Sequence, residues 1–110
     1  MERSHSVGKE NRRTARIAVS KGLWVAWQAG GPRHVSRVRD LSAGGVFIQT
    51  TVAVVIGVAV EMLFALPEGE TRIEGIVRYA DGKNGLGVEF ISMGSADRVR
   101  VEQLLRRLKR

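Results

Sequence analysis

The chain has 110 residues, 44% of them hydrophobic, and a formal net charge of +7, which fits one folded domain and excludes global disorder. It contains no cysteine, so disulfides and thiolate metal sites are excluded, and His5 and His34 lie far apart and away from any acidic cluster. The positive charge predicts an anionic partner, such as a nucleotide, a nucleic acid, an anionic lipid or an acidic protein.

The first residues are polar and have neither apolar periodicity nor the apolar core of a signal peptide. We therefore expect a flexible N-terminal tail over residues 1–11 and a folded domain over residues 12–110. No stretch approaches the roughly 18 consecutive apolar residues that a membrane-spanning helix needs. We expect no membrane span and a cytoplasmic protein.

Six strand-like runs follow, each ended by residues such as Gly, Pro, Asn and Asp that favour turns. In the first run Leu23, Val25 and Trp27 share one face, which places Trp24 on the other face; His34 is expected to be exposed at a strand end. Short strands separated by tight turns are typical of an antiparallel sandwich or barrel, and closure into a barrel removes exposed edges. The runs cover residues 23–28, 34–40, 46–50, 58–66, 71–79 and 86–91.

The C-terminal part has a different period. Its apolar residues recur at helical spacing, after Ser95 as a candidate N-cap and Asp97 in the first turn, and its last turn is basic. This pattern predicts an amphipathic helix over about residues 95–109, with its apolar face on Val101, Leu104, Leu105 and Leu108. The expected fold class is all-β with one helix.

Two clusters carry the candidate chemistry. Arg12-Arg-Thr-Ala-Arg16 precedes the first strand, and Asp40-Leu-Ser-Ala-Gly-Gly45 lies at the turn between the second and third strands. This order, RxxxR and then [D/N]xSxxG after 23 residues, resembles the PilZ domains. The resemblance continues through Gly87-Val-Glu-Phe90 to the terminal helix and so covers nearly the whole chain.

The resemblance implies a six-stranded antiparallel β-barrel that binds the bacterial second messenger cyclic di-GMP. It implies ligand contacts from both arginines of RxxxR, since the guanidinium fork matches a phosphate or the O6/N7 edge of guanine. Arg13, between them, faces either the ligand or solvent. The ligand-binding residues implied are Arg12, Arg13, Arg16, Asp40, Ser42, Gly44 and Gly45.

The second cluster has two readings. Asp40 can accept hydrogen bonds from N1–H and N2–H₂ of guanine, the Ser42 hydroxyl can serve a phosphate or a base edge, and Gly45 lets backbone approach the ligand closely. Alternatively, Asp40 and Ser42 cap the turn, and Gly44 and Gly45 are needed for its geometry. The arginines would then be solvated or paired on the surface.

Neither an acidic pair nor a Walker loop, an HExxH motif or a GxSxG elbow occurs, so we expect no enzyme, no metal and no cofactor. The expected mechanism is that ligand binding orders the RxxxR segment over the barrel and that a downstream protein reads the new surface in trans. A small basic barrel that binds RNA or single-stranded DNA is the alternative, although an aromatic content of 5% disfavours it. A ligand-free protein adaptor is a third reading. The downstream partner, the number of bound ligands, the oligomeric state and the role of the basic helix stay open.

Overall fold

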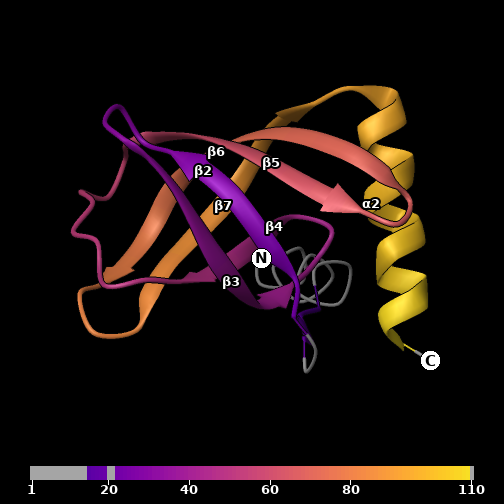
Figure 1. Ribbon diagram of the computed structural model, residues 1–110, viewed down its shortest axis with the longest axis horizontal. Coiled ribbons are helices and arrows are strands. Elements are labelled where there is room, and N and C mark those ends of the chain that lie inside the picture. The colour runs from indigo at the N-terminus through magenta and orange to yellow at the C-terminus, as the bar shows by residue number, and fades with distance from the viewer. Residues whose placement is uncertain (1–14, 20–21, 110) are drawn as a thin grey trace, which may run out of the picture.

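Six antiparallel strands close into a barrel in the computed structural model, which describes residues 15–19 and 22–109 (Figure 1). In spatial order the strands run β3-β2-β5-β6-β7-β4, and pairing of β4 with β3 closes the barrel. The expected six-stranded antiparallel barrel is thus confirmed. The strands are β2 (Trp24–Gln28), β3 (Arg33–Leu41), β4 (Gly45–Gln49), β5 (Ala59–Leu66), β6 (Gly69–Asp81) and β7 (Gly85–Met93).

A further short strand, β1 (Ile17–Ala18), was not predicted. It pairs antiparallel with the end of β3, where Ile17 lies opposite Leu41 and Ala18 opposite Asp40. The amide of Val19 also donates to the Arg39 carbonyl at 2.9 Å. Two residues are too short to show a period-2 pattern, which explains why the sequence did not reveal the strand.

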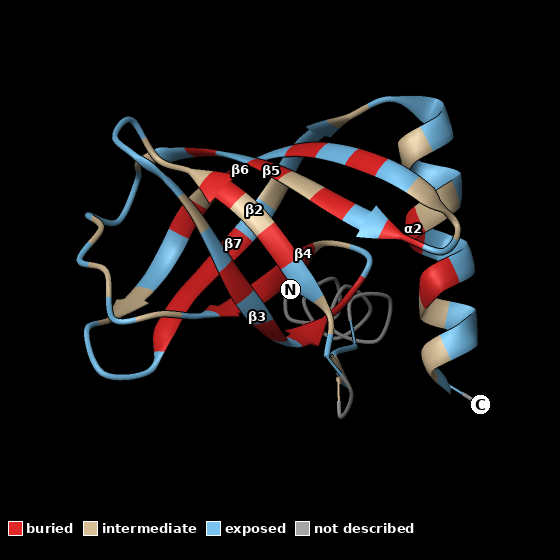
Figure 2. Cartoon of the chain, in the orientation of Figure 1, coloured by how far each residue is buried: buried red, intermediate tan, exposed pale blue. Residues whose placement is uncertain are grey.

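The core consists of side chains that point into the barrel from alternate positions along the strands. Figure 2 shows this alternation along β5. Trp27 is buried, and its indole N–H donates to the Ser36 hydroxyl at 2.9 Å. His34 lies at the end of a strand, as expected, because it is the second residue of β3. The expectation that it is exposed was wrong, since His34 is half-buried and its ring centroid lies 4.6 Å from that of Trp27.

Helix α2 (Ser95–Lys109) packs its apolar face on the barrel, which confirms the predicted helix. Val101 and Leu104 are buried in the common core, and Leu105 and Leu108 pack partly buried beside them. The N-cap is Gly94 and not Ser95, the candidate from the sequence, because the Gly94 carbonyl already accepts the first helical hydrogen bond from the Arg98 amide at 2.9 Å. Among the described residues, no helix is both long and apolar enough to cross a bilayer.

Helix α2 is also fastened by an ion pair at the β5–β6 turn. Arg107 donates from Nε and Nη2 to the two carboxylate oxygens of Glu68, at 2.6 Å and 3.0 Å. This bidentate pair lies near the C-terminal end of the helix, where a cation also suits the helix dipole. The basic end of the helix is therefore partly used to hold the fold.

Candidate functional site

Asp40 is the centre of a charged cluster at the end of β3. Its Oδ1 accepts from Nη1 of Arg16 at 2.9 Å, and its Oδ2 accepts from Nε of Arg39 at 2.9 Å. The Asp40 side chain is only 12% exposed, whereas those of Arg16 and Arg39 are 46% and 52% exposed. One nearly buried carboxylate therefore holds two solvent-facing guanidinium groups.

Local backbone geometry creates this cluster. The β1–β3 pairing brings Arg16 beside Asp40, although the two residues lie 24 positions apart in the sequence. A β-bulge between Val38 and Asp40 leaves Arg39 without a partner on β4, and its guanidinium carbon lies 3.7 Å from the centroid of the Phe47 ring. Bulges re-aim side chains and are frequent next to functional sites.

The turn after β3 is closed by Ser42. Its amide donates to the Gly45 carbonyl at 2.9 Å, and its hydroxyl oxygen accepts from the Gly44 amide at 3.2 Å. Ser42 is 2% exposed. The turn-capping role left open by the sequence is thus observed, whereas contact between Ser42 and a ligand stays a prediction.

The two glycines of the turn attach it to β7. A Cβ on Gly45 would lie 2.6 Å from the Val88 carbonyl oxygen, closer than side chains and backbone approach one another. The Gly44 carbonyl accepts from the Phe90 amide at 2.8 Å. Close packing of β4 on β7 therefore requires a glycine at position 45, a reason that sequence analysis did not identify.

Beside this turn lies a surface hollow of about 380 Å³, which we call the motif hollow. It brings Arg16 of the first cluster together with the Ser-x-x-Gly turn of the second, and Asp40 adjoins it through its bond to Arg16. Arg12 and Arg13 lie outside the described residues, as does the expected tail. The motif hollow is lined by Arg16, Ser42, Gly44, Gly45, Arg78, Tyr79, Gly87, Val88 and Glu89.

Five of these lining residues were not predicted as site residues, and three of the five have charged or aromatic side chains. Arg78 donates from Nε to Oε1 of Glu89 at 2.6 Å, and both side chains are about half exposed. Tyr79 is 52% exposed and stands over Gly87, where a Cβ would lie 3.1 Å from the Tyr79 Cβ. A bulge between Val77 and Tyr79 interrupts the register of β6 with β7 next to Arg78, and the sequence pattern of Val77-Arg-Tyr79 did not signal it.

The motif hollow offers a specific set of groups. Guanidinium groups from Arg16 and Arg78 are planar donors for phosphate or for the acceptor edge of a base. Asp40 and Glu89 are carboxylates that accept from N–H groups, and the Tyr79 ring provides an aromatic surface. In the described part of the chain, no three His, Cys, Asp or Glu side chains gather as metal ligands would.

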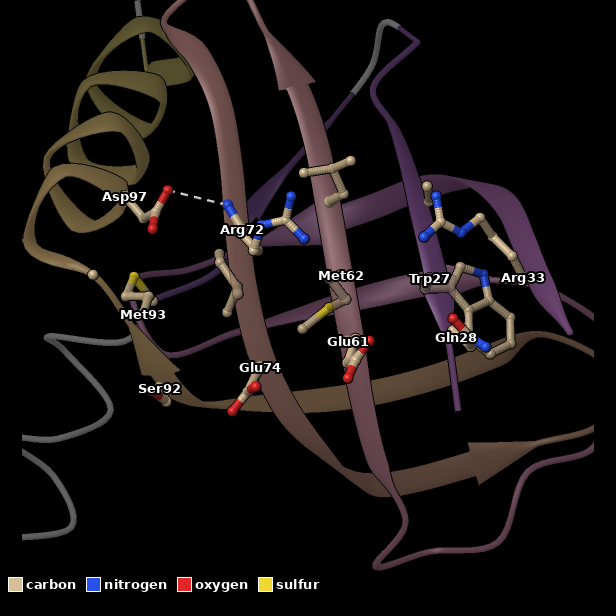
Figure 3. Close-up of a pocket in the computed structure, with 14 residues that line it drawn as sticks. Trp27, Gln28, Arg33, Glu61, Met62, Arg72, Glu74, Ser92, Met93 and Asp97 are labelled. Carbon is tan, nitrogen blue, oxygen red and sulfur yellow. Dashed lines mark hydrogen bonds between the residues drawn. The ribbon is translucent and has the colours of Figure 1, made fainter. Parts of the chain in front are cut away.

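A second hollow of about 310 Å³ lies elsewhere on the barrel and contains none of the predicted site residues. Figure 3 shows Arg33 and Gln28 at one end of it and Glu61, Glu74 and Ser92 toward the other. Strands β2, β5, β6 and β7 and the start of α2 all contribute to its lining. It is considered further below.

Comparison with known proteins gives a family and a set of structural neighbours. A family model described as PilZ domain matches residues 10–107. No curated protein matches the chain.

Solved structures match the fold. The inhibitor of motility MotI (DgrA) of Bacillus subtilis is 20% identical with a TM-score of 0.69, over 86% of this chain and 51% of that one. The PlzA protein of Borreliella burgdorferi in complex with c-di-GMP is 19% identical with a TM-score of 0.67, over 90% and 43%. The PilZ domain of YcgR from Escherichia coli with c-di-GMP is 18% identical with a TM-score of 0.68, over 89% and 91%. The chain thus spans about half the length of MotI and somewhat less of PlzA.

Proposed function

Since the chain belongs to the PilZ domain family, we propose that it is a receptor for cyclic di-GMP and not an enzyme, and that the ligand binds in the motif hollow. The observation that carries this proposal is the meeting of Arg16, Asp40 and the Ser42–Gly45 turn at one place on the barrel. PlzA and YcgR, which share the fold, have been solved with c-di-GMP. No cofactor or metal is needed for binding.

The ligand has two phosphates and two guanines, and the proposed contacts follow from this chemistry. Arg12 and Arg16 clamp phosphate or the O6/N7 edge of guanine, with Arg13 as a further donor. Asp40 accepts from the N1–H and N2–H₂ groups of guanine. Ser42, Gly44 and Gly45 provide the turn against which the ligand rests, and the Tyr79 ring offers a stacking surface beside it.

The proposed binding involves a rearrangement of the charged cluster. Each carboxylate oxygen of Asp40 already accepts one hydrogen bond, from Arg16 or Arg39, and could accept a second, but the exposed Arg16 is the contact that we propose guanine replaces. The released guanidinium can then turn to the ligand. An arginine that contacts Asp40 in one state and ligand in the other gives the two states the different interaction energies that a switch needs.

The proposed output follows from this exchange. Ligand binding orders the RxxxR segment over the barrel. In this proposal the segment belongs to a domain at residues 12–110, and residues 1–11 form a tail before it. A cytoplasmic downstream protein then reads the altered surface in trans. Hydrogen exchange with and without ligand tests this step, since residues 12–16 should exchange more slowly in the complex and equal exchange in both states would refute closure.

The binding itself is tested by calorimetry with purified protein and cyclic di-GMP. Saturable binding with a stoichiometry of one or two ligands per chain is expected. Cyclic di-AMP is the matched control, because adenine presents an amino group where guanine presents O6 and lacks the N1–H and N2–H₂ donors for Asp40. Equal binding of the two dinucleotides, or no binding of cyclic di-GMP, would contradict the proposal.

A further inference from the structure

An apolar patch lies on the outer face of strands β3, β2 and β5. Trp24 is 50% exposed and Val35 is 65% exposed, although both lie within strands of the barrel. Across the sheet, Val35 is opposite Ala26, and Ala26 is opposite Leu63, which are both half-buried. We call Trp24, Ala26, Val35 and Leu63 the outer apolar patch. Contiguous exposed apolar surface of this kind marks interaction sites more often than scattered single residues do.

The patch continues into the second hollow. Ala26 and Leu63 belong to both, so the apolar surface extends into a recess of about 310 Å³. A row of polar side chains, paired from strand to strand, crosses the hollow: Arg33, Gln28, Glu61, Glu74 and Ser92 (Figure 3). The recess can accept one protruding apolar side chain. Its charges are mixed, with Arg33 at one end of the row, Glu61 and Glu74 along it, and Arg72 and Asp97 also in the lining.

The edge of the patch on β3 is basic. Arg33 and Arg37 flank Val35 on the outer face and are exposed, and the Arg37 guanidinium carbon lies 5.2 Å from the centroid of a Trp24 ring. Neither arginine forms an ion pair within the described part of the chain. Tryptophan and arginine are the residues most enriched at the energetic centres of protein interfaces.

The kind of partner follows from charge and topology. A second copy of this chain would bring together two molecules of net charge +7, which opposes self-association. Strands β2 and β5 are paired on both sides, so on these strands side chains rather than a free strand edge must make the contact. A single exposed tryptophan is a poor platform for consecutive bases, which disfavours single-stranded nucleic acid.

We propose that the outer apolar patch is the docking surface for a protein segment that presents an aromatic or aliphatic anchor beside Asp or Glu residues. The anchor enters the hollow over Ala26 and Leu63, and the carboxylates face Arg33 and Arg37. Glu61 and Glu74 repel acidic groups placed directly beside them, which favours carboxylates on the Arg33 and Arg37 side of the patch. The inference rests on the proposed function in assuming that a downstream protein reads this receptor.

The test uses a random dodecapeptide display library selected on the full chain, followed by titration of the enriched synthetic peptides. Enriched sequences should combine a large apolar residue with at least two Asp or Glu. Their affinity should fall by about tenfold or more in Trp24→Ala and in the double variant Arg33→Glu/Arg37→Glu, the scale of an interface hot spot. Val99→Ala, which changes an apolar residue 49% exposed on α2, should bind as the parent does.

Two further substitutions test the apolar and the charged parts of the proposed surface separately. Val35→Ser removes exposed apolar surface without changing a core residue. Glu61→Gln removes the repelling charge and should leave affinity unchanged or raise it. Unchanged affinity in Trp24→Ala and Val35→Ser, or enrichment of peptides without acidic residues, would overturn the proposal. So would dimerisation, or oligonucleotide binding, that Trp24→Ala abolishes.

The same variants separate this inference from the proposed function. Trp24 does not line the motif hollow, so Trp24→Ala should bind cyclic di-GMP as the parent does. If the parent binds acidic peptides at the patch but no cyclic di-GMP, the proposed function fails and the docking surface stands. If cyclic di-GMP binds and no peptide depends on Trp24, the docking surface fails alone.

Discussion

Arg16 donates from Nη1 to Oδ1 of Asp40 at 2.9 Å, and this single hydrogen bond joins the two sequence motifs across 24 positions. The carboxylate is nearly buried, and the arginine is about half exposed. Asp40 is thus a fixed acceptor, and Arg16 is the partner that is free to move. Exchange of Arg16 from Asp40 to a ligand is the simplest motion that the site allows.

Removal of the Arg16 guanidinium should weaken cyclic di-GMP binding. We expect Arg16→Ala to cost about 1.5–3 kcal/mol of binding free energy, the scale of hydrogen bonds to charged groups. Arg12→Ala should lose a similar amount of binding free energy. Arg16→Lys should keep part of the binding free energy that Arg16→Ala loses, because lysine keeps the charge but lacks the planar fork. Calorimetry measures these losses, with Arg98→Ala on α2 as the control that retains parental binding. Parental affinity in both alanine variants would place the ligand elsewhere.

Replacement of Asp40 should affect binding more than folding. In Asp40→Ala the two released guanidinium groups are about half exposed and regain water, so the stability loss should be only about 1 kcal/mol. Binding should lose more, because guanine N–H groups then face no acceptor. Chemical denaturation and calorimetry on the same preparation give both values. A stability loss equal to or larger than the binding loss would make Asp40 a structural residue.

Gly45 should matter for stability through its contact with β7. Gly45→Ala places a methyl group 2.6 Å from the Val88 carbonyl oxygen, and the forced shift should cost about 1–3 kcal/mol of unfolding free energy. Gly31→Ala is the matched control, because no atom lies within 4 Å of its added Cβ. Denaturation curves compare the two. Equal stability of the two variants would show that β4 and β7 separate easily at this point.

Local patterns predicted the strand runs and the helix, whereas the closed six-stranded barrel was implied by the resemblance to PilZ domains. Alternation and turn residues marked the six runs, and the spacing of Val101, Leu104 and Leu108 marked the helix. The strand β1 and the stacking of His34 on Trp27 depend instead on which strands become neighbours. Neighbour relations are set by the closure of the barrel, which a single sequence does not display.

The site divides in the same way. The two motifs indicated Arg16, Asp40 and the glycine turn. They did not indicate why position 45 requires glycine, which is the close approach of the Val88 carbonyl on β7. Arg78, Tyr79 and Glu89 were missed because the bulge in β6 and the pairing with β7 bring them to the hollow. The strand register that brings them together is not visible in the sequence.

Acid should weaken the attachment of α2. The hydrogen bond from Arg107, with a smaller Coulomb contribution from the same residue, holds the pKa of Glu68 below its ordinary value of 4.5. A carboxylate with a lowered folded-state pKa stabilises the fold at pH values above its unfolded pKa, and this contribution is lost as pH falls through the lowered pKa. The hydrogen bond to Glu68 raises the pKa of Arg107 above its ordinary value, so Arg107 stays charged and its charge adds no pH dependence in this range.

Glu68→Gln tests this attachment. The parent should be more stable than the variant at neutral pH, and the difference should shrink as the pH falls below about 4.5. Asp81, whose pKa is lowered chiefly by the Lys83 amide, titrates in both proteins and cancels in the comparison. A stability difference that is constant from pH 7 to pH 3 would mean that the charge of Glu68 does not hold the helix.

Salt dependence separates the receptor from its nucleic-acid alternative. For a single strand, log K falls by about 0.7 per phosphate contacted for each tenfold rise in salt concentration. A cyclic dinucleotide has only two phosphates, so its slope should be shallow, roughly 1–2 at most. Binding of a mixed-sequence oligonucleotide, driven by the net charge of +7, should be weak and should vanish early as salt rises.

Both ligands are titrated between about 50 and 300 mM salt, a range over which screening of exposed charges changes strongly. Asp40→Ala should change the two affinities in opposite directions within the same assay. It should weaken cyclic di-GMP binding, because a guanine of the ligand loses its acceptor. It should slightly strengthen oligonucleotide binding, because one repelling negative charge is removed. Tight, steeply salt-dependent oligonucleotide binding without detectable cyclic di-GMP binding would establish the basic barrel as a nucleic-acid protein.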